Sequence, residues 1–311
     1  MSMTGSLSCE NARYIVFDLV IKSDIYLPEL TLYDGGREPD VEISISRLYD
    51  MPDDAKRVKK YIWHHGDVVH ISWPRLGEFQ VIDGRHVLMD LKSGVEMSRV
   101  RTMLLGTVIS VVLYLKQMLV VHASATLVGD KVAFFVGPSG VGKSTMVAYL
   151  QTLGFETICD DLCVFRVTEN GRVILKEGIP RVKLWTDSLE FVGTSREGLL
   201  QDSYRRDKFH DVIETIGDID VTEGNRFYLI TPEDEGDFRC QPLDKLASMI
   251  EIQKNLYQPK SAKHFLGHQF ALNAVANLLR KNSVFEIYRP TTFARTTEKH
   301  RKLIDIVGSA T

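Results

Sequence analysis

Residues 137–144 read Gly-Pro-Ser-Gly-Val-Gly-Lys-Ser, which matches the pattern G-x-x-x-x-G-K-[ST] at every fixed position. The residues before the motif, 131–136, form a short apolar run that is typical of a strand, and residues 145–153 are predicted to form a helix. Glycines let successive backbone N–H groups converge on phosphate oxygens, and the start of a helix adds the positive end of its dipole. A strand, a glycine-rich loop and a helix in this order predict an α/β fold with an anion-binding loop.

The two polar side chains that end the motif have distinct roles in this chemistry. Lys143 is expected to reach the β- and γ-phosphates of a nucleotide, and the hydroxyl of Ser144 is expected to ligate Mg²⁺. The loop residues that we expect to contact the nucleotide are Gly137, Ser139, Gly140, Val141, Gly142, Lys143, Ser144 and Thr145.

An acidic pair, Asp160 and Asp161, follows the predicted strand 156–159 directly. In an open α/β sheet, ligands bind beyond the carboxyl ends of the strands, which is where the glycine-rich loop also lies. One carboxylate there would hold Mg²⁺ and the other could accept the proton of an attacking hydroxyl. Adjacent strand residues point to opposite faces, so only a turn could bring both to one site. The alternative is an acidic pair in a solvated turn.

Three further side chains are candidates because of their places in predicted strands. His122 would lie near the phosphates if its strand pairs antiparallel with residues 131–136, although a histidine in an apolar strand is often a packed core residue. Arg181 and Lys183 flank one residue and would face the same way, toward a phosphate or toward solvent.

A basic cluster formed by Arg205, Arg206 and Lys208 lies in a segment with little periodicity. It could close over the transferred phosphate as a lid, or it could be a solvated loop.

The N-terminal third is punctuated by Gly, Pro and Asp between strand-length runs, which predicts a small β-rich domain over residues 1–98, followed by the α/β domain over 99–311. Residues 14–21 read as one strand, and residues 262–280 as one helix. The apolar stretch 103–121 is interpreted as a buried helix over 102–115 that runs into a strand over 118–122, because Lys116 and Gln117 interrupt it.

Composition excludes several classes of partner. The net charge of −3 and the isoelectric point of about 6.3 provide no basic field for nucleic acid or an anionic membrane. Four scattered cysteines are too few for a disulfide framework, and the first ten residues have no apolar signal-peptide core, so we expect reduced thiols and a cytoplasmic protein.

Together, these residues resemble the HPr kinase/phosphorylase-like P-loop kinases, and the resemblance covers roughly residues 122–185. His122 stands fifteen residues before Gly137, and Asp160 stands eighteen after Gly142, similar to the spacings in that family. The resemblance implies ATP as the phosphate donor and Mg²⁺ as its cofactor. It also implies catalytic roles for Asp160, His122 and Lys143, with Asp160 as the general base beside His122. Ser144 and Asp161 would then bind the metal, or the two aspartates would exchange these roles.

The chain departs from the HPr enzymes at their E-x-R-G signature, where it has Glu177-Gly178-Ile179-Pro180-Arg181. The His-Ala-Ser run 122–124, the segment 180–185 and the β-rich leader look instead like HPr-kinase-like proteins of peptide biosynthesis clusters, closest to lasso-peptide precursor kinases. By this resemblance the substrate is a serine hydroxyl on a precursor peptide. The N-terminal domain carries no catalytic motif, and sheet edges commonly hold extended peptides, so we expect this domain to bind the peptide and the phosphate to go to a serine near the peptide's C-terminus. A kinase of a small molecule such as free serine and an ATP-sensing regulator without transferase activity stay open, as does a homo-oligomer.

Overall fold

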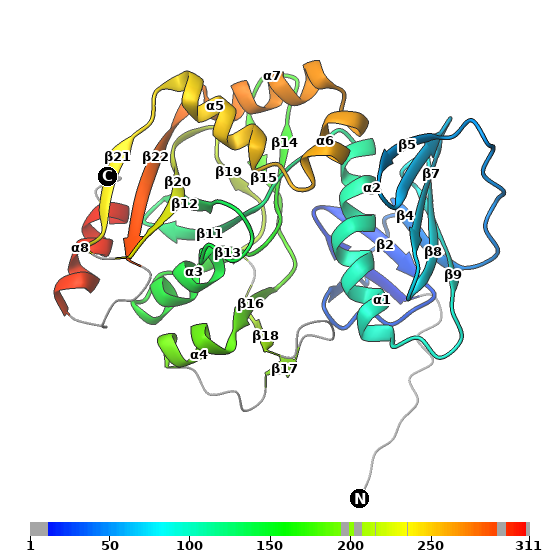
Figure 1. Ribbon diagram of the computed structural model, residues 1–311, viewed down its shortest axis with the longest axis horizontal. Coiled ribbons are helices and arrows are strands. Elements are labelled where there is room, and N and C mark those ends of the chain that lie inside the picture. The colour runs from blue at the N-terminus through cyan, green and yellow to red at the C-terminus, as the bar shows by residue number, and fades with distance from the viewer. Residues whose placement is uncertain are drawn as a thin grey trace, which may run out of the picture. The chain divides into compact units, whose positions relative to one another are not determined.

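The computed structural model describes residues 12–193, 199–201, 207–214, 216–234, 236–290 and 297–308. Its internal contacts divide the chain into two compact units, Met1–Lys116 and Gln117–Thr311 (Figure 1). Each unit has mixed secondary structure, and several β-sheets are present.

The first unit is built on a nine-stranded sheet with the strand order β3-β1-β2-β4-β9-β8-β7-β6-β5. Its strands are β1 (Ala12–Val16), β2 (Leu19–Ser23), β3 (Thr31–Leu32), β4 (Val41–Ile45), β5 (Lys56–Lys59), β6 (Ile62–His65), β7 (Val68–Trp73), β8 (Gly77–Ile82) and β9 (His86–Leu91). The β-rich character expected for the N-terminal part is present. β2, β4 and β9 pair in parallel, whereas the other neighbours pair antiparallel.

The prediction of one strand over residues 14–21 is wrong, because a tight hairpin turns at Phe17 and Asp18. Both turn residues have positive φ, 55° and 61°, which a two-residue hairpin of the favoured twist requires. Arg37 holds the turn by donating to the Asp18 carboxylate at 3.0 Å and to the Asp18 carbonyl at 2.9 Å. The usual glycine is absent, so the sequence offered little signal of the turn.

A continuous helix ends the first unit. It consists of α1 (Met97–Met103), a π-helical turn η1 (Leu104–Val108) and α2 (Ile109–Leu115), and the strand β10 (Leu119–Val121) follows. The predicted helix and strand are therefore confirmed. By length and composition, 97–115 is also the one helix among the described ranges that could cross a membrane, and 61% of its most apolar window is buried within the protein.

The division between the units lies after Lys116, whereas the sequence analysis placed it after residue 98. The helix belongs with the N-terminal sheet because Arg101 donates to Glu29 at 2.8 Å. In addition, a Cβ atom built on Gly84 would lie 3.1 Å from Cβ of Leu115. Glycine at this position lets the helix approach the β8–β9 turn closely.

The second unit contains three sheets and most of the helices. The six-stranded sheet has the order β13-β11-β12-β20-β22-β21, the four-stranded sheet β10-β14-β15-β19, and the three-stranded sheet β16-β18-β17. The strands are β11 (Ala123–Val128), β12 (Lys131–Val136), β13 (Thr157–Cys159), β14 (Cys163–Val167), β15 (Val173–Leu175), β16 (Arg181–Trp185), β17 (Leu200–Gln201), β18 (Lys208–Val212), β19 (Ile219–Asp220), β20 (Glu223–Glu233), β21 (Arg239–Pro242) and β22 (Lys281–Pro290). The helices are α3 (Lys143–Thr152), α4 (Thr186–Val192), α5 (Lys245–Lys254), α6 (Pro259–Phe265), α7 (His268–Leu279) and α8 (Thr297–Gly308).

The helix expected over 262–280 is divided into α6 and α7. Gly267 lies between them with φ +78°, a conformation that interrupts an α-helix and that glycine adopts without strain. A hairpin that turns at Asn170-Gly171 joins β14 and β15, which pair antiparallel.

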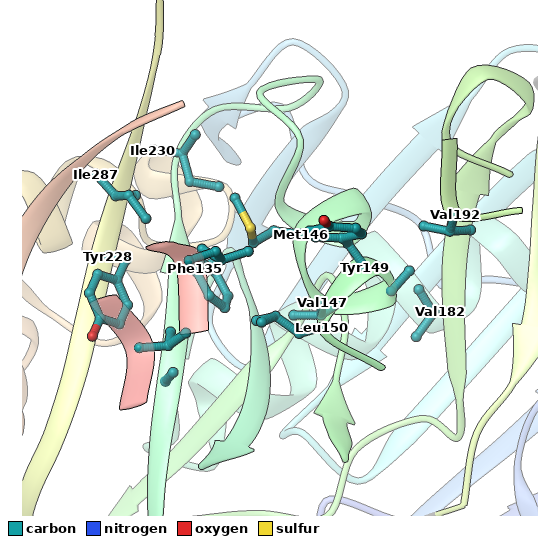
Figure 2. Packing of buried hydrophobic residues seen from close by; sticks show 14 of the residues in the cluster. Phe135, Met146, Val147, Tyr149, Leu150, Val182, Val192, Tyr228, Ile230 and Ile287 are labelled. Atoms are coloured by element: carbon teal, nitrogen blue, oxygen red, sulfur yellow. The ribbon is translucent and has the colours of Figure 1, made fainter. Parts of the chain in front are cut away.

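Helix α3 is packed between the six-stranded sheet and the β16–α4 segment. Figure 2 shows Met146, Val147, Tyr149 and Leu150 of α3 between Phe135, Tyr228 and Ile287 of the sheet and Val182 and Val192 on the other side. Six of the ten residues of α3 are buried, which explains why its sequence has no single apolar stripe. This packing fixes the helix and therefore the loop that precedes it.

The chain passes between the four-stranded and six-stranded sheets at two neighbouring points. One passage, between β10 and β11, contains His122, and the other, between β13 and β14, contains Asp160 and Asp161. The two passages are adjacent because β10 pairs with β14 and β11 pairs with β13. The topology thus brings together polar residues that are far apart in the sequence.

Candidate active site

The glycine-rich loop joins β12 to α3, as the sequence predicts. Gly137 has φ +150°, and a Cβ atom built there would lie 2.9 Å from Cγ1 of Val141, so only glycine fits at the start of the loop. Gly142 has φ +101° and is the N-cap of α3. The loop therefore ends at the N-terminus of a ten-residue helix, where backbone N–H groups are available to an anion.

Lys143 is folded back onto this loop. Its Nζ donates to the carbonyl oxygen of Gly137 at 2.8 Å and to that of Pro138 at 3.0 Å, and the residue is only 5% exposed. An ammonium group held by neutral carbonyls at the mouth of an N–H-lined loop can move to phosphate oxygens with a gain in charge pairing. The side chain is therefore placed for the role that the motif predicts.

The acidic pair lies on a tight turn, as a shared site requires. The N–H of Leu162 donates to the carbonyl oxygen of Asp160 at 2.9 Å, which closes a three-residue turn centred on Asp161. Asp161 has φ +74°, the value of the rare and strained form of this turn. Backbone strain of this kind costs of order 1–3 kcal/mol and concentrates at functional sites.

Asp160 is a buried acceptor for three donors that come from separate segments. Its Oδ1 accepts from Ser124 at 2.5 Å and from Ser144 at 2.8 Å, and its Oδ2 accepts the backbone N–H of Lys183 at 2.9 Å. The residue is 8% exposed. Its carboxylate therefore connects β11, the first turn of α3 and β16.

Asp161 lies between two basic side chains. Its Oδ1 is 3.2 Å from Nε2 of His122, and its Oδ2 accepts from Nζ of Lys183 at 2.6 Å. Lys183 thus contacts both aspartates, one through its backbone and one through its ammonium group. Its side chain points into the site, as the first of the two alternatives for β16 predicts.

The pairing of the aspartates favours the second of the two assignments that the family resemblance leaves open. His122 contacts Asp161, whereas the P-loop hydroxyl of Ser144 contacts Asp160. The reason is the turn, which directs the first carboxylate toward α3 and the second toward the β10–β11 passage. The sequence could not show this difference because it depends on the φ angle of Asp161.

The segment that joins α5 to α6 is hydrogen-bonded to the residues around His122. The N–H of His122 donates to the carbonyl oxygen of Asn255 at 2.9 Å, and the N–H of Tyr257 donates to the carbonyl oxygen of Val120 at 2.9 Å. The rings of His122 and Tyr257 meet edge to face with centroids 5.9 Å apart. Burial, together with the nearby Asp161 carboxylate, raises the pKa of Tyr257, so its phenol stays protonated at neutral pH.

The remaining residues that the sequence analysis predicts for the site differ in how close they lie to the aspartates. Arg181 is 7% exposed, and its positive charge opposes the rise in the pKa of Tyr257, which places it beside the same cluster. Thr145 shares a hydrogen bond of 2.7 Å with Ser188 of α4. Arg205 and Arg206 lie outside the described residues. The backbone of Lys208 pairs with Trp185 in the three-stranded sheet, and its side chain also lies outside the description.

Sequence reasoning assigned no role to Ser124 or Tyr257. Ser124 carried a signal, because it is two residues from His122 at the start of a strand. Tyr257 had none, since its contact with the site depends on how α5 and α6 pack. A cavity of about 830 Å³ in this unit, lined by α5, α7 and β22, includes none of the P-loop, aspartate or histidine residues.

The oxygen atoms at the loop fit a magnesium ion. Ser144 Oγ and Asp160 Oδ1 are hard donors 2.8 Å apart beside the phosphate loop, and Mg²⁺ is usually bound by one or two such protein oxygens together with substrate phosphates. The described residues contain no cluster of three or more His, Cys, Asp or Glu side chains that could hold a metal without a substrate.

Comparison with known proteins gives similarity to solved structures but no match to a protein family. The chain matches no protein-family model, and no curated protein matches it. Among solved structures, it is similar to the Hpr(Ser) kinase/phosphatase from Coxiella burnetii, with 11% identity over 60% of this chain and 92% of that chain, and a TM-score of 0.28. A likeness this low does not establish a shared activity.

The hydrogen bonds of Asp160 predict different costs for two substitutions of nearly the same volume. In Asp160→Asn the amide oxygen can face the Lys183 N–H and its NH₂ can face the two hydroxyl oxygens, so we expect a loss of about 1 kcal/mol in the free energy of unfolding. Asp160→Leu leaves one buried and two partly buried donors without this acceptor and should cost about 3 kcal/mol. Urea unfolding of both variants measures the difference. Equal stability would mean that this carboxylate does not hold the three segments together.

Proposed function

We propose that this chain is an ATP-dependent kinase that transfers the γ-phosphoryl group to a serine hydroxyl. The observation that carries the proposal is the continuity of the site: the P-loop serine bonds to Asp160, and the next residue, Asp161, contacts His122. A phosphate-binding loop and an acceptor-activating carboxylate are the two parts that such a transfer needs. Here they are joined through adjacent residues of one strained turn.

The phosphates would bind to the loop N–H groups and to Lys143, which exchanges two carbonyl partners for phosphate oxygens. Ser144 and Asp160 are the residues that would hold Mg²⁺. When bound, the ion neutralises charge on the phosphates. This assignment is the second of the two that the family resemblance leaves open, and it is chosen because Asp160 is the carboxylate beside the P-loop serine.

Asp161 would then be the general base. The acceptor oxygen attacks the γ-phosphorus, the bond from that phosphorus to the β,γ-bridging oxygen breaks, and ADP leaves with the electron pair. The hydroxyl proton passes to the Asp161 carboxylate. His122 and Lys183 hold this carboxylate in place. The ammonium group of Lys183 balances its charge and is also within the site to meet the transferred group.

The geometry of the site argues against one of the two rival functions and does not distinguish the other. A regulator that only senses ATP needs the loop but has no use for a strained second carboxylate held by a histidine and a lysine. A small-molecule kinase would use the same catalytic residues, so only the acceptor separates it from a peptide kinase.

Substitutions of the two aspartates should affect different steps, the transfer rate for Asp161 and Mg²⁺ binding for Asp160. Asp161→Asn should lower the transfer rate by about 100-fold or more while the affinity for Mg·ATP stays within a few fold, because the base acts on the acceptor proton. Asp160→Asn should raise the Mg²⁺ concentration needed for half-maximal binding. Lys143→Ala, as a reference, should lose nucleotide binding. Titrations with ATP and Mg²⁺, alongside single-turnover transfer, separate these effects. The opposite pattern would restore Asp160 as the base, and no effect from either would leave the pair purely structural.

We propose that the acceptor is a peptide that is held in part by the first unit. The resemblance to lasso-peptide precursor kinases favours a lasso precursor as this peptide. Binding at a sheet edge is not the favoured mode. β3, at one edge, has two residues, and β5, at the other, carries Lys56, Arg57 and Lys59 and a bulge, all features that discourage pairing with another strand.

A pocket of about 350 Å³ on the same unit is a better place for a peptide side chain. The residues that line it include Trp63, His70 and the carboxylates of Asp53 and Glu78. Burial lowers the pKa of His70, against the opposing effect of Glu78, so the imidazole is neutral at pH 7 and the pocket has negative charge. An aromatic ring beside carboxylates suits a lysine or arginine side chain.

The acceptor is identified by incubating the protein with Mg·ATP and three candidates: a peptide with a basic residue and a serine near its C-terminus, folded HPr, and free serine. We expect a gain of about 80 Da, one phosphoryl group, on the peptide alone. Glu78→Gln should raise the KM for the peptide several-fold without changing kcat, whereas Glu38→Gln, an exposed change in the same unit, should change neither. Phosphorylation of serine but not of the peptide would favour the metabolite kinase, and ATP binding without transfer to any candidate would favour the regulator.

A further inference from the structure

Arg289, near the end of β22, lies against the phosphate loop although no sequence motif marks it. A Cβ atom built on Gly142 would be 3.2 Å from Cζ of Arg289 and 3.3 Å from its Nε and Nη2. The guanidinium group therefore occupies the space beside the N-cap of α3, and the glycine of the motif leaves room for it.

The sheet topology explains how a residue this distant in sequence comes to the loop. β12, β20 and β22 run in parallel, and the register aligns Val136 with Leu229 and Leu229 with Glu286. Arg289 is three residues beyond this row, and the P-loop begins one residue beyond it. Both are thus at the carboxyl edge of the sheet, where ligands of α/β folds bind.

The guanidinium group of Arg289 has few protein partners for a half-buried charge. Its Nε is buried and has no hydrogen-bond partner among the described residues, and its Nη1 has only a long contact of 3.3 Å with the Pro290 carbonyl oxygen. Burial lowers the pKa of Arg289, and no neighbouring carboxylate offsets that effect. Arginine nevertheless stays charged in proteins, and a buried charge is normally paired.

We infer that Arg289 is a second cation for the nucleotide phosphates, which complete its hydrogen bonds when they bind to the loop. This inference rests on the proposed function, and it adds a binding residue that neither the loop motif nor the family resemblance contains. The planar guanidinium can offer two N–H groups to one phosphate, whereas Lys143 offers a single charged group. Arg289 is a binding residue in this account and takes no part in proton transfer.

The test measures binding and not turnover, with ATP and inorganic tripolyphosphate as competitors of a fluorescent ATP analogue. Arg289→Gln should lower the affinity for ATP and for tripolyphosphate about tenfold or more, because hydrogen bonds between charged groups are lost. Both affinities should fall because phosphates are the part that the two ligands share. Arg172→Gln is the matched control, since Arg172 is an exposed residue of the same unit that pairs with Asp220, and it should change neither affinity.

Two results would overturn the inference. Weaker binding of ATP with unchanged binding of tripolyphosphate would mean that Arg289 contacts the base or sugar, and unchanged binding of both would mean that it is structural. Lys143→Ala, measured in parallel, distinguishes a failure of the inference about Arg289 from a failure of the proposed function. If it loses tripolyphosphate while Arg289→Gln keeps it, only this inference fails. If the wild type binds no tripolyphosphate, the proposed function fails as well.

If Arg289→Gln does not fold, the wild-type protein still provides a decision. The Nε–H resonance of Arg289, assigned by its loss from the spectrum of Arg289→Lys, should shift when tripolyphosphate is added. An unchanged resonance in a protein that binds tripolyphosphate would rule out the contact.

Discussion

The site in the second unit depends on the hydrogen bonds to the buried carboxylate of Asp160. It accepts hydrogen bonds from Ser124, Ser144 and the N–H of Lys183, and these donors come from a strand, a helix and a strand of another sheet. A charged acceptor that is 8% exposed is stable only if such donors surround it. The same bonds that satisfy the charge therefore fix the P-loop helix relative to β11 and β16.

Once Asp160 is fixed, the turn after it determines the position of Asp161. The positive φ of Asp161 turns the second carboxylate away from α3 and toward His122 and Lys183. Two adjacent acidic residues thereby receive different surroundings, hydroxyl and amide donors for one and basic side chains for the other. Two carboxylates in different environments can have different roles, one toward a metal ion and one toward a proton.

Much of this arrangement can be predicted from the sequence because its signals are local. The P-loop, the strand before it and the helix after it follow from the spacing of glycines and apolar residues, and the need for a turn at Asp160–Asp161 follows from strand geometry. Other features depend on tertiary structure. The partner of each aspartate depends on one φ angle, and Arg289 reaches the loop through the register of parallel strands. The Phe17–Asp18 turn lacks glycine and depends on Arg37, which is about twenty residues away.

The proposed function requires that the loop at 137–144 hold a nucleoside triphosphate beside the acidic pair. A crystal structure of the protein with Mg²⁺ and a non-hydrolysable ATP analogue would show whether it does. We expect the phosphates on the loop N–H groups, Nζ of Lys143 bonded to phosphate in place of the carbonyl oxygens of Gly137 and Pro138, and the metal at Ser144 and Asp160. An analogue bound elsewhere, or a Lys143 that keeps both carbonyl contacts with the analogue present, would contradict it.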